Sequence, residues 1–440
     1  MMFKYFPHTP NDIKEMLARI GVNSIDDLFG DIDPSLLIDE ELNIPNSHTE
    51  DELKKEVIKL GEKNSKLISF LGAGSYDVFT PSVCKALTSR QEFLTSYTPY
   101  QPEVSQGTLQ YIFEFQSMIC ELTGMDVTNA SMYDGATATA EAMFMAVNQT
   151  KRNTIILSDT INPNVIEVVK TYARYRDINI VMLESKDYIP QLSDLKVKLN
   201  NDVAAVIFSN PNFYGVIENY HEISTLIKEN NSLFILNSDP STLAVLKTPR
   251  EWGADIACGE AQSLGIPLSF GGPYLGYLAT TFKLMRKLPG RICGMTNDVD
   301  GKRGFVLTLQ AREQHIRREK ANSNICSNQS LMALHATIYM SLLGKEGLKE
   351  AALRAYNNAH YLEEKLLETN KFSKVTNNPF FKEFVLKYHG DANALHEFLL
   401  KHKYLGGLIL DNNKILFCAT EKRTKTEIDD FAKLVGEAHV

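Results

Sequence analysis

Short apolar runs alternate with amphipathic segments between residues 154 and 236, and this alternation restricts the fold more than any other feature of the sequence. Each apolar run ends in turn residues, which is typical of a buried parallel strand. Strands and helices in alternation form a doubly wound α/β sheet with right-handed crossovers. The pattern predicts strands over Thr154–Ser158, Ile178–Leu183, Val203–Ser209 and Leu233–Leu236, and helices over Asn162–Arg174, Leu192–Leu199 and Tyr220–Glu229.

The regions on either side of this alternation predict three domains in all. Residues 1–65 hold two capped helical segments, Thr9–Gly21 and Ser47–Gly61, but they are too few and too segmented to form a core alone. We therefore expect a helical arm that packs on another body. Residues 66–325 form the large α/β domain. Residues 326–440 combine helical segments with alternating strands, which predicts a smaller α+β C-terminal domain.

Composition excludes several classes of protein. The 440 residues carry a net charge of −8 that is spread along the chain, which argues against a nucleic-acid partner. No run approaches the roughly 20 apolar residues of a membrane span, and the N-terminus lacks the apolar core of a signal peptide. The six cysteines form no CxxC pair and no His-rich spacing, so we expect reduced thiols, no metal and a cytoplasmic protein.

The stretch from Ser232 to Gly276 lies where a parallel sheet places its ligands, beyond the carboxyl ends of the strands. Asp239 follows one strand, and a second strand, Ala254–Cys258, leads into the loop Gly259–Gly265 and a Gly-Gly-Pro turn. This arrangement resembles the centre of a pyridoxal-phosphate (PLP) enzyme of the aminotransferase type. In such an enzyme the acid pairs with the pyridine nitrogen of PLP, and a lysine in the later loop forms the Schiff base.

That lysine is missing from this chain. The sequence has no lysine between Lys247 and Lys283, and Gln262 stands at the position expected for the Schiff-base lysine. Because an amide cannot form an imine, this half-site is predicted to be chemically silent.

Further polar residues belong to the same cleft. The helix that begins near Asp134 and Thr137 corresponds to the one whose N-terminus binds the cofactor phosphate in PLP folds, because free amides and the helix dipole favour an anion. Asp134 brings a negative charge that would repel a phosphate; the alternative is that it is only the N-cap. Asn212 and Asp239 lie at strand ends, and for Asp239 the alternative is a solvated acid that caps its strand.

Two loops are notable for their composition. The segment Tyr97–Gly107 holds two tyrosines, two glutamines and a glutamate on a backbone stiffened by prolines. Such a loop suits a small polar ligand or an interface, and the alternative is a solvent loop without a role. The glycine-rich segment Phe70–Asp77 is a weak sign of a phosphate site, and a plain tight turn is the better interpretation.

Four stretches together resemble the α chain of the glycine cleavage system P-protein family: Tyr5–Thr9, Tyr97–Gly107, Tyr133–Thr137 and Arg318–Cys326. The resemblance covers almost the whole chain, and the Tyr97–Gly107 stretch is highly specific. It implies an aminotransferase-like α/β fold (PLP fold type I), with a mostly parallel sheet in the large domain and a smaller α+β C-terminal domain. It also implies an enzyme of two homologous chains, in which the β chain carries PLP on its lysine and this chain is a degenerate copy.

The family implies PLP-dependent decarboxylation of glycine and transfer of the aminomethyl group to the lipoyl arm of the H-protein. It also implies a heterotetramer of two α and two β chains. Two homologous chains that pair about a pseudo-two-fold axis would place the loops of each chain in the cleft of the other chain. We therefore expect a contribution to the partner's PLP site from Tyr97, Tyr100, Gln101, Glu103 and Ser105. This chain's own vestigial cleft would comprise Asp134, Thr137, Asn212, Asp239 and Gln262.

Three arginines, Arg312, Arg317 and Arg318, are candidates for contact with the partner chain or with an acidic carrier protein. Their mixture with Glu313 and Glu319 is more typical of plain surface charge.

Two other functions stay open. One is an autonomous PLP-dependent lyase that uses a lysine elsewhere, although Lys247 precedes the Ala254–Cys258 strand and Lys283 follows the next one, so both are poorly placed for an imine. The other is a regulatory or binding homologue that has kept the fold and lost the chemistry. The tyrosine-rich loop argues against it, because a protein without a ligand has no evident need for that arrangement.

Overall fold

The computed structural model describes residues 5, 7–38, 40–326, 328–411 and 413–439. These residues separate into two compact units, with the boundary between Ser65 and Lys66. Phe6, within the first stretch that carries the family resemblance, lies outside the described residues. The further division of the second unit at residue 326 stays a prediction.

The first unit consists of two capped helices joined by short turns. Helix α1 (Pro10–Ile20) begins at Thr9, whose hydroxyl accepts the N–H of Asp12, and it ends at Gly21 in left-handed backbone. Helix α2 (Glu50–Gly61) is capped in the same way by Thr49. None of the described residues of this unit is buried. The unit therefore has no core of its own. Two 3-10 turns lie between the helices, η1 (Asp26–Phe29) and η2 (Pro34–Leu36).

The second unit is built on a seven-stranded sheet with the strand order β2-β10-β9-β8-β7-β3-β4. The five strands from β9 to β4 are parallel, whereas β10 runs antiparallel to both of its neighbours. The predicted doubly wound, mostly parallel sheet is confirmed. Its strands are β2 (Val127–Thr128), β3 (Thr154–Ser158), β4 (Asn179–Leu183), β7 (Val203–Ser209), β8 (Leu233–Asn237), β9 (Ile256–Glu260) and β10 (Gly276–Thr280).

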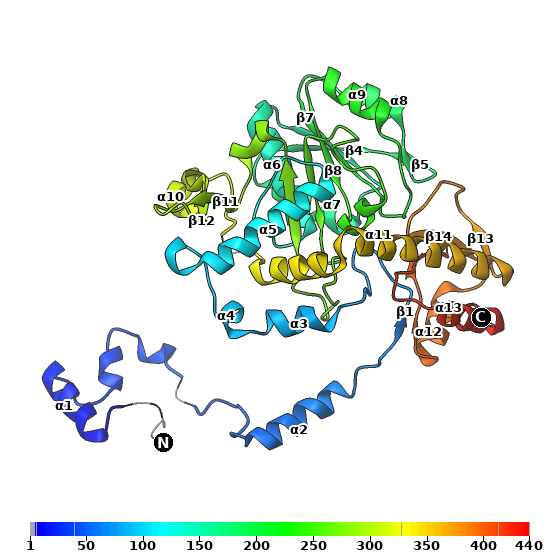
Figure 1. Ribbon diagram of the computed structural model, residues 1–440. Coiled ribbons are helices and arrows are strands. Elements are labelled where there is room, and N and C mark those ends of the chain that lie inside the picture. The colour runs from blue at the N-terminus through cyan, green and yellow to red at the C-terminus, as the bar shows by residue number, and fades with distance from the viewer. Residues whose placement is uncertain (1–4, 6, 39, 327, 412, 440) are drawn as a thin grey trace. The chain divides into compact units, whose positions relative to one another are not determined.

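Helices cover both faces of this sheet (Figure 1). Successive residues of β7 show why: Val206 and Phe208 pack into a core shared with α5, α9 and α11, whereas Ala205 and Ile207 pack into a core shared with α6 and α7. A strand buried on both faces is expected to be a continuous apolar run, and β7 is one from Val203 to Phe208. The helices are α5 (Gln106–Thr123), α6 (Gly135–Thr150), α7 (Pro163–Arg174), α8 (Leu192–Lys198), α9 (His221–Glu229) and α11 (Ser330–Glu368).

The C-terminal part is an antiparallel sheet of four strands in the order β13-β14-β17-β16, with helices packed on it. Its core joins Phe384 and Phe417 of the sheet to Phe431 of α13 and to Leu366 near the end of α11. Helix α11 is two helices end to end, because Gly344 has non-helical backbone. The predicted small α+β sheet region is confirmed. Its elements are β13 (Phe372–Lys374), β14 (Glu383–Tyr388), α12 (Ala392–Lys401), β16 (Leu408–Ile409), β17 (Lys414–Cys418) and α13 (Lys425–Glu437).

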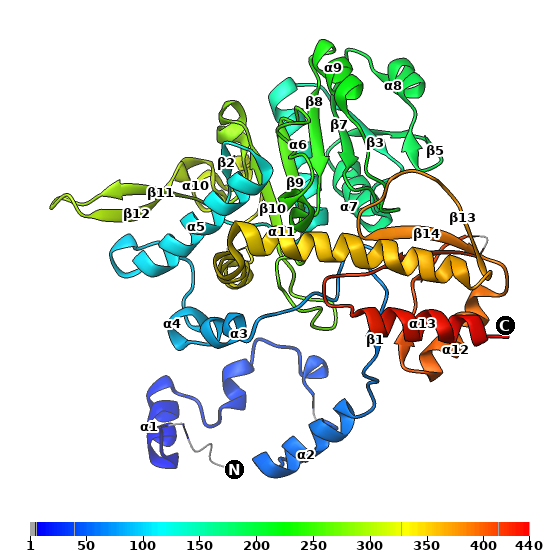
Figure 2. The same ribbon diagram turned by 45° about the vertical axis from the view of Figure 1, so that its right-hand side comes forward.

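Short elements complete the second unit. The hairpin of β11 (Ile292–Asn297) and β12 (Arg303–Thr308) is not part of the main sheet and projects away from it in Figure 2. Among the described residues, no helix has both the length and the apolar content of a membrane span. The remaining elements are α3 (Ser82–Thr88), α4 (Gln91–Leu94), α10 (Gln314–Arg317), and the strand pairs β1 (Ile68–Ser69) with β15 (Tyr404–Leu405) and β5 (Ser185–Lys186) with β6 (Ile189–Pro190).

Candidate functional site

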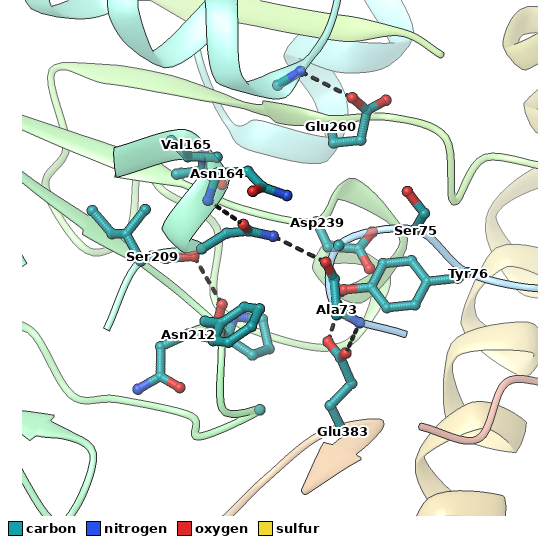
Figure 3. A pocket seen from close by; sticks show the side chains of 18 of the residues that line it. Ala73, Ser75, Tyr76, Asn164, Val165, Ser209, Asn212, Asp239, Glu260 and Glu383 are labelled. Carbon is teal, nitrogen blue, oxygen red and sulfur yellow. Dashed lines mark hydrogen bonds between the residues drawn. The ribbon is translucent and has the colours of Figure 1, made fainter. Parts of the chain in front are cut away.

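A cavity of about 320 Å³ lies at the carboxyl ends of the central strands. Its wall is formed by the loops after β7 and β8, the end of β9, the start of α6 and residues 73–76, while residues 381–383 reach it from the C-terminal part. Doubly wound sheets bind their ligands at this edge. Of the five residues expected in the vestigial cleft, Asp134, Asn212 and Asp239 line this cavity, whereas Thr137 and Gln262 do not. Figure 3 shows side chains that line it.

Asp239 lies directly beyond β8 at the start of the 3-10 helix η4 (Pro240–Ala244), and it is not solvated. Its Oδ1 accepts the Ser241 N–H at 3.0 Å and the Ser263 hydroxyl at 2.5 Å. Its Oδ2 accepts the Lys382 ammonium. The Asp239 and Lys382 side chains are only 12% and 7% exposed. The interpretation of Asp239 as a solvated acid is therefore wrong, because Asp239 is half of a buried ion pair.

Lys382, which precedes β14, is a residue of this cleft that the sequence analysis missed. Its ammonium also lies 3.5 Å from the ring centroid of Tyr76, a cation–π contact. Burial acts to lower the pKa of Lys382, but the charge of Asp239, the hydrogen bond to Asp239 and the nearby Cys418 and Glu383 together outweigh burial and raise the pKa. The amine is therefore held protonated. No local pattern marks this residue, because it stands 143 positions from Asp239 in the chain.

Two carboxylates occupy the N-terminus of α6. Asp134 caps the helix, since its Oδ1 accepts the Thr137 N–H at 2.7 Å while the Thr137 hydroxyl accepts the Asp134 N–H at 3.3 Å. Glu260, the last residue of β9, accepts the Gly135 N–H at 2.9 Å. The N-cap interpretation of Asp134 is confirmed, whereas Glu260 was not among the predicted residues.

Glu260 is buried and well supplied with donors. Its second carboxylate oxygen accepts the Leu275 N–H at 2.9 Å and the Gln262 N–H at 3.1 Å. Burial raises the pKa of Glu260 to about 7; the three N–H donors act against this rise, and the charge of Asp134 adds to it. Glu260 and Asp134 thus take two amides that would otherwise face an incoming anion.

Gln262 is fully buried in the loop after β9 and does not line the cavity. Its side-chain oxygen accepts the Tyr76 N–H at 2.8 Å, and its amide nitrogen donates to the carbonyls of Tyr76 at 2.9 Å and Ile266 at 2.6 Å. The side chain holds residues 73–76 against the loop after β9. A lysine could not make this set of bonds, because an ammonium has no acceptor.

The glycine-rich segment is a turn, as predicted, but it also lines the cavity, which the sequence did not indicate. Glu383 holds it, because its carboxylate accepts the Ala73 N–H at 2.6 Å and the Tyr76 hydroxyl at 2.8 Å. Asn162 donates to the Ala73 carbonyl at 3.0 Å. Figure 3 shows Glu383 reaching up to both residues of the turn.

Asn212 lines the cavity, but it is engaged within the protein. Its amide nitrogen donates to Glu218 and to the Tyr188 carbonyl, both at 2.8 Å. Its oxygen accepts the N–H groups of Tyr214 at 3.0 Å and Val216 at 3.1 Å. Asn212 therefore shapes the loop after β7.

The residues expected to reach a partner's site lie elsewhere, and none of them lines this cavity. Tyr97 is 79% exposed, and Gln101 and Glu103 are exposed as well. Tyr100 is 49% exposed. Ser105 is half-buried and precedes α5. The structure thus places the segment Tyr97–Ser105 on the surface of this chain.

A buried cluster anchors Tyr100. The guanidinium of Arg291 lies 5.3 Å from the ring centroid of Tyr100 and donates to its hydroxyl at 3.4 Å. Arg291 is itself buried and ion-paired with buried Glu313 at 3.7 Å. The ring of His315 lies against Tyr100 as well. Tyr100 is therefore held in place by contacts with Arg291 and His315, although it belongs to the exposed segment.

The other candidate residues take ordinary structural roles. Lys247 lies 3.2 Å from His221 Nε2 and over the Trp252 ring, and Lys283 is exposed on η5 (Phe282–Lys287); neither lines the cavity. Arg312 is half-buried and donates to the backbone carbonyls of Leu309, Leu288 and Gly290. Arg317 and Arg318 are exposed. All six cysteines are free, and the described residues contain no group that could hold a metal ion.

Comparison with known proteins decides the family. Residues 3–435 match the family model described as glycine cleavage system P-protein. The chain belongs to the glycine cleavage system P-protein family. It is 48% identical to the probable glycine dehydrogenase (decarboxylating) subunit 1 of Staphylococcus carnosus over 99% of both chains. It is 49% identical to the protein of the same name from Moorella thermoacetica over 97% of both chains.

Solved structures agree with this assignment. A glycine decarboxylase (P-protein) of the glycine cleavage system, in inhibitor-bound form, is 40% identical and superposes with a TM-score of 0.92. That match covers 99% of this chain and 100% of that chain. Glutamate decarboxylase from Lactobacillus brevis, 11% identical over 95% of this chain and 98% of that one, has a TM-score of 0.71 and shares the fold alone. The predicted PLP fold type I is confirmed.

The cleft of this P-protein chain does not fit PLP. Asp239, which stands where the acid for the pyridine nitrogen is expected, is already paired with Lys382. At the start of α6, where the phosphate is expected, Asp134 and Glu260 accept the amides. The loop after β9 offers buried Gln262 in place of an amine. Each of the three features by which such a fold holds PLP is therefore changed.

Proposed function

We propose that this chain is the α subunit (subunit 1) of a two-chain glycine dehydrogenase (decarboxylating), and that a homologous β subunit binds PLP covalently in its place. The loop after β9 carries the proposal, because it contains no lysine and its Gln262 is bonded into the protein interior. Lys382 is the one lysine among the described residues that line the cavity. It is held as a cation, and a protonated amine is not a nucleophile. Relatives named subunit 1 imply a second subunit.

The exposed segment Tyr97–Ser105 is proposed to complete the PLP site of the β subunit. Its hydroxyl and amide groups suit hydrogen bonds to the cofactor phosphate or to the glycine carboxylate, and Glu103 suits a polar neighbour. Catalysis needs such groups to be held rigidly. Support comes from the prolines of the segment and from the Arg291–Glu313 pair beneath Tyr100.

PLP bound to the β subunit supplies the electron sink for the loss of CO2 from glycine. The part of this chain is to orient the substrate carboxylate and to exclude water at the shared site. The aminomethyl group then passes to the lipoyl arm of the H-protein. We propose an assembly of two α and two β chains, in keeping with the pairing of homologous subunits about two-fold axes.

Reconstitution tests the proposal. The β chain is expressed with and without this chain, and glycine–bicarbonate exchange is measured in the presence of lipoylated H-protein. We expect a stable complex and exchange at least about 100-fold faster than with the β chain alone, because the β site would lack its positioning groups. A β chain that forms no complex and exchanges equally fast alone would contradict the proposal and favour a regulatory or binding homologue.

Two substitutions test the exposed segment. Tyr97→Phe removes only a hydroxyl and Glu103→Ala removes a carboxylate, both from exposed positions. We expect each to lower exchange by the complex about tenfold or more, with an unchanged unfolding midpoint. Tyr175→Phe is the matched control, because Tyr175 is 77% exposed and outside this segment. Wild-type turnover in both variants would remove Tyr97 and Glu103 from the site.

A further inference from the structure

We infer that the cleft carries built-in substitutes for two groups of PLP: the Lys382 ammonium replaces the pyridinium nitrogen opposite Asp239, and the Glu260 carboxyl group replaces the phosphate as the hydrogen-bond acceptor at α6. This inference rests on the proposed function and deepens it. If it is correct, the missing loop lysine is only one of the reasons why this chain leaves PLP to its partner.

The first substitution lies beside β8. In a PLP fold the acid at this strand end faces a protonated ring nitrogen, which is a cationic N–H donor. Here Asp239 faces the Lys382 ammonium, which is also a cationic N–H donor. The ammonium also lies over the face of the Tyr76 ring, 3.5 Å from its centroid, in a cation–π contact. Asp239 thus keeps its ionic partner without any ligand.

The second substitution lies at the start of α6. A helix N-terminus attracts an anion because its first N–H groups have no intrahelical partner. Glu260 accepts the Gly135 N–H, and Asp134 accepts the Thr137 N–H. The start of α6 packs closely against the end of β9, because a Cβ atom at Gly135 would lie 2.6 Å from the backbone nitrogen of Glu260. A phosphate entering here would meet two acidic side chains whose oxygens already accept these N–H groups, rather than free amides.

Lys382 and its neighbour Glu383 also connect the C-terminal part of the chain to the wall of the cavity. Lys382 and its neighbour Glu383 come from the C-terminal part, whereas Asp239, Ala73 and Tyr76 belong to the wall formed around the main sheet. Figure 3 shows Glu383, Tyr76 and Asp239 converging on one side of the cavity. Opening the cleft at this side would break a buried ion pair and two hydrogen bonds to a buried carboxylate, which is costly.

An ordinary structural ion pair would give the same contacts, so the test must measure gain of binding. PLP is titrated into the full-length chain and into a Glu260→Gln/Lys382→Met variant, with binding followed by calorimetry. We expect no saturable binding to the natural chain over the PLP concentrations used, and saturable binding to the variant with an affinity at least about tenfold above the detection limit for the natural chain. Lys387→Met is the matched control, because Lys387 is exposed on the same strand, β14, and should leave the affinity unchanged. Equal affinities of the folded variant and the natural chain would overturn the inference.

Removal of Lys382 leaves Asp239 buried without its cation, so a second measurement checks the pairing itself. Lys382→Met should lower the thermal unfolding midpoint, and Asp239→Asn/Lys382→Met should recover at least about half of that loss, because the unpaired charge is gone. Equal midpoints of the single and the double variant would contradict the pairing. If Lys382→Met does not fold at 25 °C, Lys382→Gln replaces it in the titration, because glutamine keeps a donor for Asp239 without the charge.

The inference and the proposed function fail in different ways. A natural complex with PLP on a lysine of this chain would refute the proposed function. A Glu260→Gln/Lys382→Met variant that folds and still does not bind PLP would refute only the inference.

Discussion

Gln262 fixes the position of two loops with one side chain. It bonds both backbone groups of Tyr76 and the carbonyl of Ile266, and it is fully buried. Gln262→Leu would remove the side-chain partner of the Tyr76 N–H and of the Ile266 carbonyl where water cannot replace the amide, and it would leave the Tyr76 carbonyl with the Val78 N–H alone. We expect the free energy of unfolding to fall by about 3 kcal/mol in urea denaturation. The exposed control Gln91→Leu should change it by less than about 0.5 kcal/mol, and an equally small change for Gln262→Leu would refute this role.

Glu260 makes stability depend on pH. Its pKa is raised from 4.5 to about 7, first by burial. Between these values the folded protein keeps a proton that the unfolded chain releases, so the contribution of Glu260 to stability falls as the pH rises through this window. Glutamine does not titrate, so the Glu260→Gln variant should not lose this stability. The free energy of unfolding of the variant minus that of the wild type should therefore increase by about 2 kcal/mol when the pH is raised from 5 to 8. The pKa values of Glu141 and Glu218 are also raised, to about 7 and about 8, but these two residues are present in both proteins, so their contributions cancel in the difference. A difference that is constant with pH would contradict the burial of Glu260.

Sequence distance decides which residues of the site could be predicted. Asp134 was recognisable as a cap because its partner Thr137 stands three positions away. Glu260 bonds Gly135 across 125 positions, and Glu383 bonds Ala73 across 310. No local pattern carries such pairs, since they meet only after the sheet and the C-terminal part have packed.

Helix α6 shows at the scale of one element how an anion site can be lost while the helix is kept. Asp134→Ala removes the side chain that accepts the Thr137 N–H, and we expect a loss of about 1 kcal/mol in unfolding free energy. Asp134→Asn keeps a capping oxygen and should cost less than about 0.5 kcal/mol. Urea denaturation of the two variants side by side measures this. Equal losses would mean that the charge of Asp134, not its capping bond, stabilises the helix.

Among the elements, predictability follows burial. Strands β3 and β7 were predicted residue for residue, because both are buried throughout and each contains a continuous apolar run that ends at a serine. Strand β11 was missed, since only its first two residues are buried and its last three are exposed. Strand β2 has two residues and no pattern to detect.

At the scale of the whole molecule, the first unit has no core of its own, and we expect it to pack on another body, its own chain's or a partner's. No described residue between 5 and 65 is buried, although α2 exposes Leu53, Val57 and Leu60 by 53%, 57% and 54%. These three residues lie on one face at helical spacing. We expect Leu53→Lys/Val57→Lys to weaken association with the β subunit at least about tenfold, measured by calorimetry. Lys55→Ala, an exposed change on the same helix, is the control, and wild-type affinity of the double variant would exclude α2 from the interface.

The family of the whole chain could be predicted because its specific stretches are local in sequence, as in Tyr97–Gly107. The site shared with a partner stays a proposal, because part of it is proposed to lie on another polypeptide.

The central claim is that this chain brings no PLP lysine of its own and works through a companion that does. The most direct measurement is borohydride reduction of the assembled complex with PLP, followed by mass-spectrometric mapping of the labelled lysine. The account predicts one specifically labelled lysine in the β chain and none in this chain, with Lys382 unmodified. Stoichiometric label on Lys382, or on any other lysine of this chain, would contradict it.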